Sequence, residues 1–163
     1  DLFKDVFDTT KDILLYKDST DITLHRDFVE FKRISDTSID FYWATCVVFK
    51  KTEFTKMFFE LIEHIRQEWN HYANLYQLNT RIYRNDYSFS IAVDILQSEK
   101  IGLMPGTMLY STDKDVLFKM EDDTLKFLVE KKDRLGQYTA VYTHKQNVHV
   151  MNKFSLNRMI GDM

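Results

Sequence analysis

The residues with the clearest chemical potential lie near the C-terminus, in the stretch His149-Val-Met-Asn-Lys153. This stretch closely follows a predicted strand, Gln137–Thr143. A neutral imidazole can ligate a divalent metal ion, and an ammonium group can hold a phosphate. The pair His149 and Lys153 can therefore bind a metal-bound diphosphate.

A second stretch, Arg84-Asn85-Asp86, places a carboxylate at the predicted start of a helix. Asn85 is a favourable N-cap residue, and Asp86 falls in the first turn. Arg84 is a candidate partner for a phosphate or a carboxylate. We expect Asp86 to face a cleft that also holds His149 and Lys153, because a metal-bound diphosphate must lie beside the group that accepts the transferred unit.

Length and composition predict a soluble globular chain. A chain of 163 residues suits one domain, which buries roughly 70% of its unfolded surface. Its longest apolar runs fall far short of the roughly 20 residues that a membrane helix needs, so we expect no membrane span. The net charge of −3 argues against a dedicated surface for binding nucleic-acid duplexes, although Lys126, Lys131, Lys132 and Arg134 form a local basic cluster.

The single cysteine, Cys46, lies in the apolar run Ala44–Phe49, which favours a small buried hydrophobic residue over a nucleophile. With no disulfide pair, we expect a reducing compartment, the cytoplasm. The chain has 4 Gly and 1 Pro but 13 Phe and 9 Tyr, with abundant Lys, Asp, Asn and Ile. This usage indicates an AT-rich genome, that of a bacterium or of a phage or other virus, and in the viral case the location is the host cytoplasm.

Hydrophobic periodicity predicts the elements that position these residues. Apolar residues recur with helical spacing from Thr52, a plausible N-cap, to about Tyr76. This long amphipathic helix should pack on a sheet that contains Ala44–Phe49 and should bury Phe58, Leu61, Ile65 and Trp69. A shorter helix is predicted over Asp86–Leu96. Alternation predicts a hairpin of Val116–Met120 and Thr124–Val129 across the turn Glu121–Asp123.

The remaining predicted elements are short. We expect strands over Ile13–Tyr16, Phe28–Lys32, Phe41–Lys50 and Gln137–Thr143, loops over Lys17–Asp21 and Gly102–Gly106, and a terminal helical turn or two over Asn152–Met159. The fold class that follows is α/β: one domain over residues 1–163, with a mixed sheet, a long amphipathic helix and a late β-hairpin.

Other motifs favour simpler interpretations. Asp113-Lys114-Asp115 has the D-x-D pattern that can chelate a metal-bound nucleotide diphosphate. It lies in a polar Ser-Thr-Asp-Lys-Asp loop, which favours a solvated turn over a metal site. The sequence contains no H-x-x-x-H, C-x-x-C, G-x-S-x-G or Walker-type loop, so hydrolase and nucleoside-triphosphatase functions have no motif to support them.

In the order of its elements the chain resembles the C-terminal half of a GT-A-type, nucleotide-sugar-dependent glycosyltransferase, particularly uncharacterised phage and bacterial members. The resemblance covers most of residues 36–155. It is carried by the strand Trp43–Phe49, the helix Thr52–Tyr76 with Phe58-Phe59, Arg84-Asn85-Asp86, the late hairpin and His149-Val-Met-Asn-Lys153.

The resemblance implies transfer of a sugar from a nucleotide-sugar donor to an acceptor. It implies that Asp86 contacts the acceptor or donor sugar, that His149 binds Mn²⁺ or Mg²⁺ together with D-x-D aspartates, and that Lys153 contacts the diphosphate. The family's N-terminal nucleotide-binding strands and their D-x-D are absent, and the spacing from His149 to Lys153 is shorter than in glycogenin-like members. We therefore expect this chain to be the C-terminal part of a larger one.

Two other functions remain open. In a non-enzymatic viral structural or protein-interaction module, Asp86 is an ordinary helix acid, His149 is a satisfied imidazole at a strand end, and the aromatic residues form core or interface. In a nucleic-acid-processing accessory protein, the basic cluster Lys126–Arg134 carries the contacts.

Overall fold

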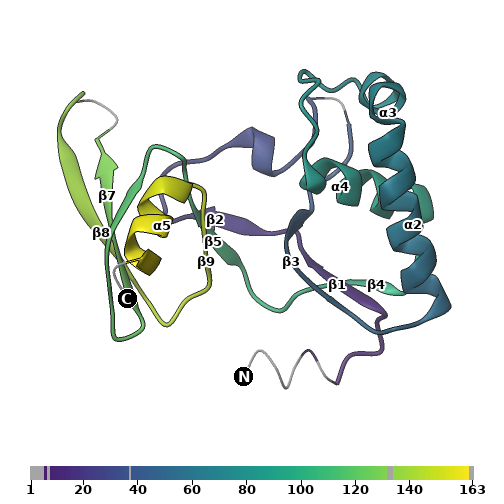
Figure 1. Cartoon of the computed structure of the whole chain (residues 1–163), viewed down its shortest axis with the longest axis horizontal. Coiled ribbons are helices and arrows are strands. Elements are labelled where there is room, and N and C mark those ends of the chain that lie inside the picture. The colour runs from purple at the N-terminus through teal and green to yellow at the C-terminus, as the bar shows by residue number, and fades with distance from the viewer. Residues whose placement is uncertain (1–5, 7, 37, 132–133, 162–163) are drawn as a thin grey trace. The chain divides into compact units, whose positions relative to one another are not determined.

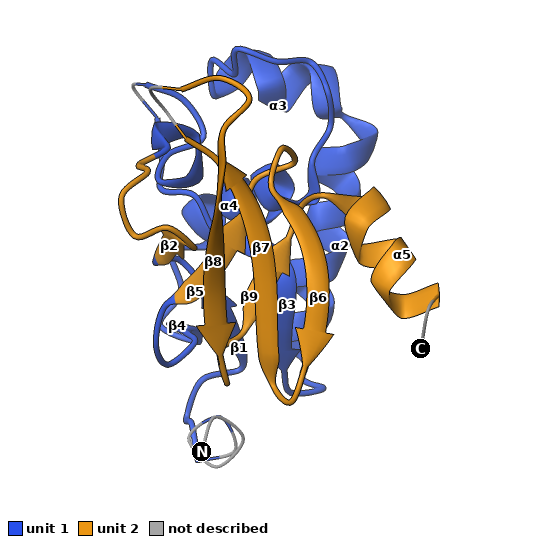
Figure 2. Ribbon diagram, turned by 90° about the vertical axis from the view of Figure 1, so that its left-hand side faces the viewer, with its two compact units in different colours: residues 1–18, 28–107 blue, residues 19–27, 108–163 orange. Residues whose placement is uncertain are grey.

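The chain forms a mixed α/β structure that divides into two compact units. A computed structural model describes residues 6, 8–36, 38–131 and 134–161. Unit 1 comprises Asp1–Asp18 and Phe28–Thr107, and unit 2 comprises Ser19–Asp27 and Met108–Met163 (Figure 2). The α/β class is confirmed. The single domain over residues 1–163 stays a prediction, since two compact units can belong to one domain.

Unit 1 is built on a three-stranded sheet with the order β3-β1-β4 (Figure 1). The central strand β1 (Ile13–Tyr16) pairs antiparallel with β3 (Trp43–Phe49) and parallel with β4 (Ile101–Leu103). All four residues of β1 are buried, which explains why its sequence is apolar without alternation.

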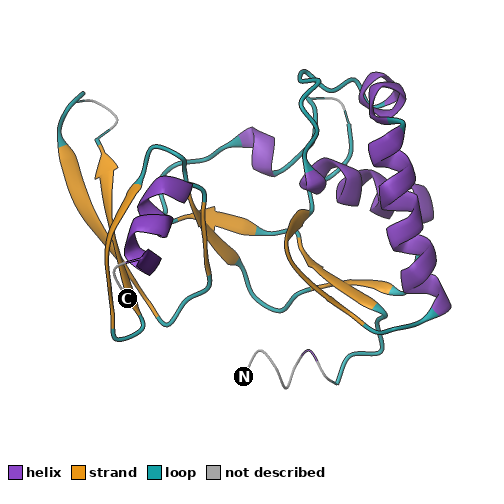
Figure 3. Ribbon diagram, viewed as in Figure 1, coloured by secondary structure: helices purple, strands orange, loops and turns teal. Residues whose placement is uncertain are grey.

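The longer helices in the described part of unit 1 are α2 (Glu53–Gln67), α3 (Trp69–Leu75) and α4 (Asn85–Leu96), drawn in purple in Figure 3. The predicted cap at Thr52 is confirmed: its Oγ1 accepts a hydrogen bond from the Thr55 N–H, and the Thr55 Oγ1 accepts one from the Thr52 N–H. The prediction of one continuous helix to Tyr76 is wrong, because Glu68, at φ −97° and ψ 31°, leaves the helical region and separates α2 from α3.

The predicted burial of the long helix is confirmed for three of the four predicted residues. Phe58 and Ile65 are fully buried and Trp69 is only 9% exposed, whereas Leu61 is only half-buried. Helix α4 contacts both α2 and β3, so it links the long helix to the sheet. Helix α2 also contacts the sheet directly at one end of β3, where the ring of Phe59 lies 5.0 Å from the ring of Phe49.

Unit 2 contains two sheets and one described helix. β2 (Ser19–Asp21), β5 (Met108–Ser111) and β9 (Val148–Val150) pair in the order β2-β5-β9, and both pairings are parallel. β6 (Val116–Glu121), β7 (Thr124–Glu130) and β8 (Tyr138–His144) form an antiparallel meander. Asp122 and Asp123, with φ of 45° and 61°, make the two-residue turn of the predicted hairpin.

The core of unit 2 joins both sheets and α5 (Lys153–Gly161). Its partly buried residues come from β7, β8, β9 and α5. The buried members are Ile22, Leu109, Leu117, Phe127, Val129 and Val150. Among the described helices of the chain, none is long and apolar enough to cross a membrane.

Several short elements differ from the prediction. Phe28–Lys32 is not a strand; it contains the 3-10 turn η1 (Val29–Phe31), which buries only Phe31. The predicted loop Lys17–Asp21 contains β2, the predicted loop Gly102–Gly106 contains the last two residues of β4 (Ile101–Leu103), and β5 and β9 were not predicted. These strands of three or four residues obtain their hydrogen bonds from partners far away in the sequence, so local patterns do not reveal them.

The cap at Thr52 should contribute measurably to stability. Thr52→Ala removes the acceptor for the Thr55 N–H, and we expect the free energy of unfolding to fall by about 1 kcal/mol. Urea denaturation followed by circular dichroism measures the change. Thr107→Ala, at an exposed loop position, is the control and should leave the midpoint unchanged. Equal midpoints for the two variants would contradict a stabilising cap.

Candidate functional site

The structure places Asp86 and Arg84 together in unit 1, at the start of α4. The Asp86 Oδ1 accepts a hydrogen bond from the Ala44 N–H at 2.8 Å, and its Oδ2 lies 3.0 Å from the Arg84 Nη2. The Ser90 Oγ adds a second bond to this strand segment, accepting from the Tyr42 N–H at 2.8 Å. Asp86 therefore fastens the first turn of α4 to β3, and its side chain is only 16% exposed.

The predicted cap of α4 is different. The N-cap residue is Arg84, which makes no side-chain capping bond, and Asn85 is the first helical residue. Arg84 is held by three aromatic rings, with its guanidinium carbon 5.1 Å from the ring centroid of Tyr87, 5.7 Å from that of Phe41 and 6.0 Å from that of Phe31. Cation–π contacts of this kind fix an arginine in place. The guanidinium is thus presented by a rigid aromatic surface.

His149 and Lys153 belong to unit 2, at one end of the parallel sheet. His149 is the middle residue of β9, rather than a residue after the last strand, and it is half-buried. Its neighbour across the sheet is Tyr110, whose own neighbour is Asp21. Residues in register share a face of a sheet, so these three form one row, on the face opposite to Val148 and Val150.

Lys153 is the first residue of α5, two positions beyond Met151 and exposed. Asn152 caps this helix, because its Oδ1 accepts a hydrogen bond from the Ser155 N–H at 3.0 Å. Lys153 makes no ion pair with any other residue that the structure describes. Its ammonium group therefore stands at a helix N-terminus, which favours anions, beyond the carboxyl end of a parallel strand, where ligands of open α/β sheets bind.

A buried ionic cluster lies at the same sheet end. The Arg26 guanidinium donates to Asp21 from Nε (2.9 Å) and Nη2 (2.6 Å), and to Asp115 from Nη1 (2.9 Å) and Nη2 (2.6 Å). The two carboxylate side chains are 0% and 1% exposed. Burial alone would lower the pKa of Arg26, but its hydrogen bonds to Asp115 and Asp21 raise it above the ordinary value.

Only one of the two aspartates of the D-x-D motif belongs to this cluster. Asp113 is exposed, as a solvated turn predicts, whereas Asp115 is buried. The Asp115 Oδ2 also accepts bonds from the Thr112 N–H (2.7 Å) and Oγ1–H (3.0 Å). The prediction of a solvated turn is therefore wrong for Asp115. Sequence reasoning missed Arg26, since its partners lie 5 and 89 positions away and no motif connects them.

The residues that the structure describes bring no group of three or more His, Cys, Asp or Glu side chains together in a form that could hold a metal ion. Asp21 and Asp115 already share the charge of Arg26. These residues do not form a ready site for Mn²⁺ or Mg²⁺, so the metal stays a prediction from the resemblance.

Two further predictions are corrected or limited by the structure. Cys46 is exposed on β3 rather than buried. It lies on an edge strand, where the register of β3 with β1 shifts between Val47 and Trp43, and the adjacent Thr45 is exposed as well. In the basic cluster, Lys126 lies on β7, whereas Lys132 lies outside the described residues.

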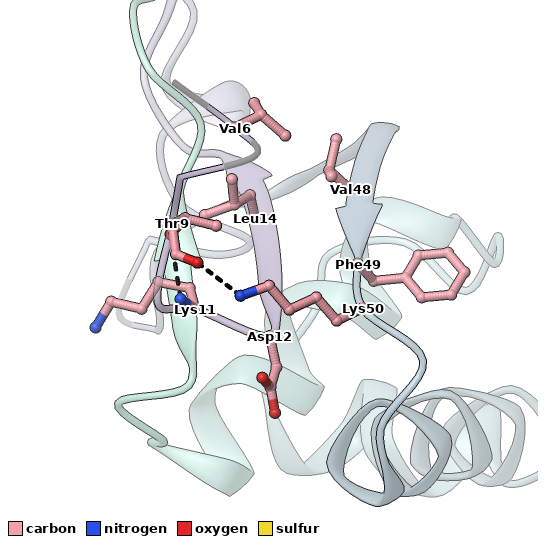
Figure 4. A pocket seen from close by; sticks show the side chains of 8 residues that line it. All are labelled: Val6, Thr9, Lys11, Asp12, Leu14, Val48, Phe49 and Lys50. Atoms are coloured by element: carbon pink, nitrogen blue, oxygen red, sulfur yellow. Dashed lines mark hydrogen bonds between the residues drawn. The ribbon is translucent and has the colours of Figure 1, made fainter. Parts of the chain in front are cut away.

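A small pocket in unit 1 does not suit a nucleotide. Its volume is about 110 Å³, below the roughly 300 Å³ at which small-molecule sites begin. In Figure 4 the Lys50 side chain reaches toward Thr9, whose carbonyl oxygen accepts from the Lys50 Nζ at 2.6 Å. The Lys11 Nζ donates to the Glu99 carbonyl at 2.7 Å. The ammonium groups of Lys50 and Lys11 thus both donate hydrogen bonds to backbone carbonyls.

No protein-family model matches the chain, and neither a curated protein nor a solved structure matches it. The likeness to GT-A transferases consequently rests on the motif residues themselves.

Removing the cation from the buried cluster should strongly destabilise unit 2. Arg26→Met leaves two buried carboxylates without a positive charge, and we expect the free energy of unfolding to fall by about 3–5 kcal/mol. Thermal denaturation measures the loss. The matched control is Arg66→Met, since Arg66 is 65% exposed and its contact with Glu63 is 3.7 Å long. Similar melting temperatures for the two variants would show that the cluster is not a structural element.

Proposed function

We propose that this chain is a glycosyltransferase-like protein that binds the diphosphate of a nucleotide-sugar donor at the carboxyl end of the sheet β2-β5-β9. The observation that carries the proposal is the position of Lys153, exposed at the N-terminus of α5 directly beyond β9. Ligands of open α/β sheets bind at the carboxyl ends of parallel strands, and helix N-termini favour phosphate groups.

In this proposal each residue has a separate task. Lys153 stabilises the negative charge that develops on the departing nucleoside diphosphate. His149, in the middle of β9, orients the donor beside it. Asp86, supported by Arg84, positions a sugar hydroxyl, so that placement and electrostatics supply most of the rate enhancement. The metal that the resemblance implies, Mn²⁺ or Mg²⁺, would add positive charge at the diphosphate.

Nucleotide binding tests the proposal directly. In calorimetric titration of the complete protein with nucleoside diphosphates, with and without Mn²⁺, we expect Lys153→Ala to weaken binding about tenfold or more, because it removes a charged hydrogen bond. Lys119→Ala, an exposed lysine on β6, is the control and should bind as the wild type does. His149→Ala should also weaken binding, because His149 orients the donor in this proposal. No binding under any condition would refute the transferase proposal.

Two substitutions at Asp86 separate its structural and functional tasks. Asp86→Asn keeps an oxygen that can accept from the Ala44 N–H, whereas Asp86→Ala removes that acceptor. We expect Asp86→Asn to fold with nearly unchanged stability but to lower sugar transfer by about 10²-fold in the full-length protein, a magnitude typical of a misplaced reactant. Asp86→Ala should also lose about 1–3 kcal/mol of stability.

Release of nucleoside diphosphate from a panel of nucleotide sugars measures transfer, and chemical denaturation measures stability. Full activity of Asp86→Asn would assign Asp86 to the attachment of α4 alone.

A second candidate function, a protein-interaction module, is favoured by the exposed face of the sheet β6-β7-β8. Tyr138 and Tyr142 on this face are 53% and 61% exposed. The two nearby lysines, Lys119 and Lys126, share one acidic partner, Glu121. Hydrogen bonds from Lys119 and then Lys126 hold the pKa of the Glu121 carboxyl below its ordinary value.

This face is therefore aromatic and nearly balanced in charge. Exposed tyrosines are enriched where proteins bind proteins, whereas nucleic-acid surfaces carry a basic excess. The most direct test of this second function is self-association, since a second copy of the chain is a partner that is always present in the purified protein.

A further inference from the structure

The strand β8 (Tyr138–His144) forms an open edge of the sheet β6-β7-β8. One edge of β8 pairs with β7, and within the described part of the chain no strand pairs with the other. The opposite sheet edge is different, because α5 closes it. There the Leu117 N–H donates to the Ser155 Oγ at 3.2 Å, and the Arg158 Nη2 donates to the Leu117 carbonyl at 3.4 Å.

The backbone groups that β8 directs toward its open edge follow from the register. At the two ends of the pairing, the Lys145 N–H donates to the Asp123 carbonyl (2.9 Å) and the Lys131 N–H donates to the Gln137 carbonyl (2.8 Å). Hydrogen-bonded pairs alternate along an antiparallel ladder. Thr139, Val141 and Thr143 therefore bond to β7. The outward N–H and C=O groups belong to Tyr138, Ala140, Tyr142 and His144.

The open edge lacks the features that usually protect such strands. Natural sheet edges are blocked by charged side chains, proline, bulges or very short strands. β8 has seven residues, none of them Pro, Lys, Arg, Asp or Glu, and its register with β7 has no bulge. The outward backbone groups of β8 can therefore pair with another strand.

We propose that β8 pairs antiparallel with β8 of a second copy of this chain, about a two-fold axis at Val141. This register pairs all seven residues, and its hydrogen-bonded pairs, Tyr138 with His144 and Ala140 with Tyr142 of the other copy, use only outward backbone groups. The inference is independent of the transferase proposal, and it names a partner for the interaction module.

The side chains of β8 are complementary to themselves in this register. On the face with the tyrosines, a large residue meets a small one at Tyr142 and Ala140, and an aromatic ring meets an imidazole at Tyr138 and His144. On the other face Thr139 meets Thr143, and Val141 meets itself; β-branched pairs of this kind stabilise sheets. The nearest charge, Lys145, falls opposite Gln137, so no like charges meet. A two-fold interface of this type closes on itself as a dimer.

Cysteine cross-linking tests the register. In the two-fold pairing, the Cα atoms of Val141 and its copy are a non-hydrogen-bonded pair about 4.5 Å apart, within disulfide range. In a Cys46→Ser background, which removes the exposed native thiol, Val141→Cys should form a covalent dimer under mild oxidation. Thr139→Cys is the matched control. In the two-fold pairing, residue 139 and the same residue of the other copy are four positions apart along the strands, a separation of roughly 13 Å, so this variant should not cross-link.

Sedimentation velocity over a range of concentrations tests the dimer without a cross-link. We expect the wild-type chain to dimerise. Ala140→Pro should remain monomeric at concentrations at least tenfold above those at which the wild type dimerises, because proline removes an outward N–H and leaves the hydrogen bonds to β7 intact. Ala140→Ser keeps that N–H and should still dimerise. Circular dichroism confirms that each variant is folded.

A monomeric wild type, an Ala140→Pro variant that dimerises as the wild type does, or cross-linking of Thr139→Cys in place of Val141→Cys would overturn the proposal. Each outcome leaves the nucleotide titration unaffected, so the two proposals fail separately.

Discussion

The double ion pair of Arg26 is the interaction on which the organisation of unit 2 depends. Residues 19–27 enter this unit between two segments of unit 1, so the sequence that surrounds them belongs elsewhere. β2 supplies only three residues of pairing with β5. Arg26 adds two hydrogen bonds to Asp115, which join this short segment to the turn that follows β5, and two to Asp21 within the segment itself. A planar guanidinium suits this task because it can serve two carboxylates at once.

The elements that the sequence predicted well are those stabilised by local interactions. The α2 helix has a capping box and a continuous apolar stripe, and the β6–β7 hairpin has alternating residues around a two-residue turn. The elements that it missed, β2, β4, β5 and β9, have three or four residues each and no periodicity to detect. They exist because parallel partners distant in the sequence complete them, which local patterns cannot indicate. The η1 turn was mistaken for a strand because a run of five residues with two Phe fits either structure.

The candidate site shows the same division. The position of Asp86 in the first turn of α4 followed from the sequence, but its bond to the Ala44 N–H, 42 positions away, did not. The placement of Lys153 at a helix N-terminus was nearly correct, since Asn152 is a recognisable cap. His149 was expected beyond a strand and lies within one, because β9 is defined only by its pairing with β5. Asp115 was interpreted from its polar neighbours, although a cation 89 positions away determines its burial.

The two proposals concern different sheets of unit 2, and the structure gives a reason why they can coexist. Lys153 and Ser155 both lie in the first turn of α5, yet Lys153 is exposed beyond β9 while Ser155 is buried against β6. One short helix thereby closes the β6 edge and presents a cation at the parallel sheet. With that edge closed, β8 is the remaining open edge of the meander. Pairing at β8 uses backbone groups of neither α5 nor β9, so the two proposals depend on different residues of unit 2.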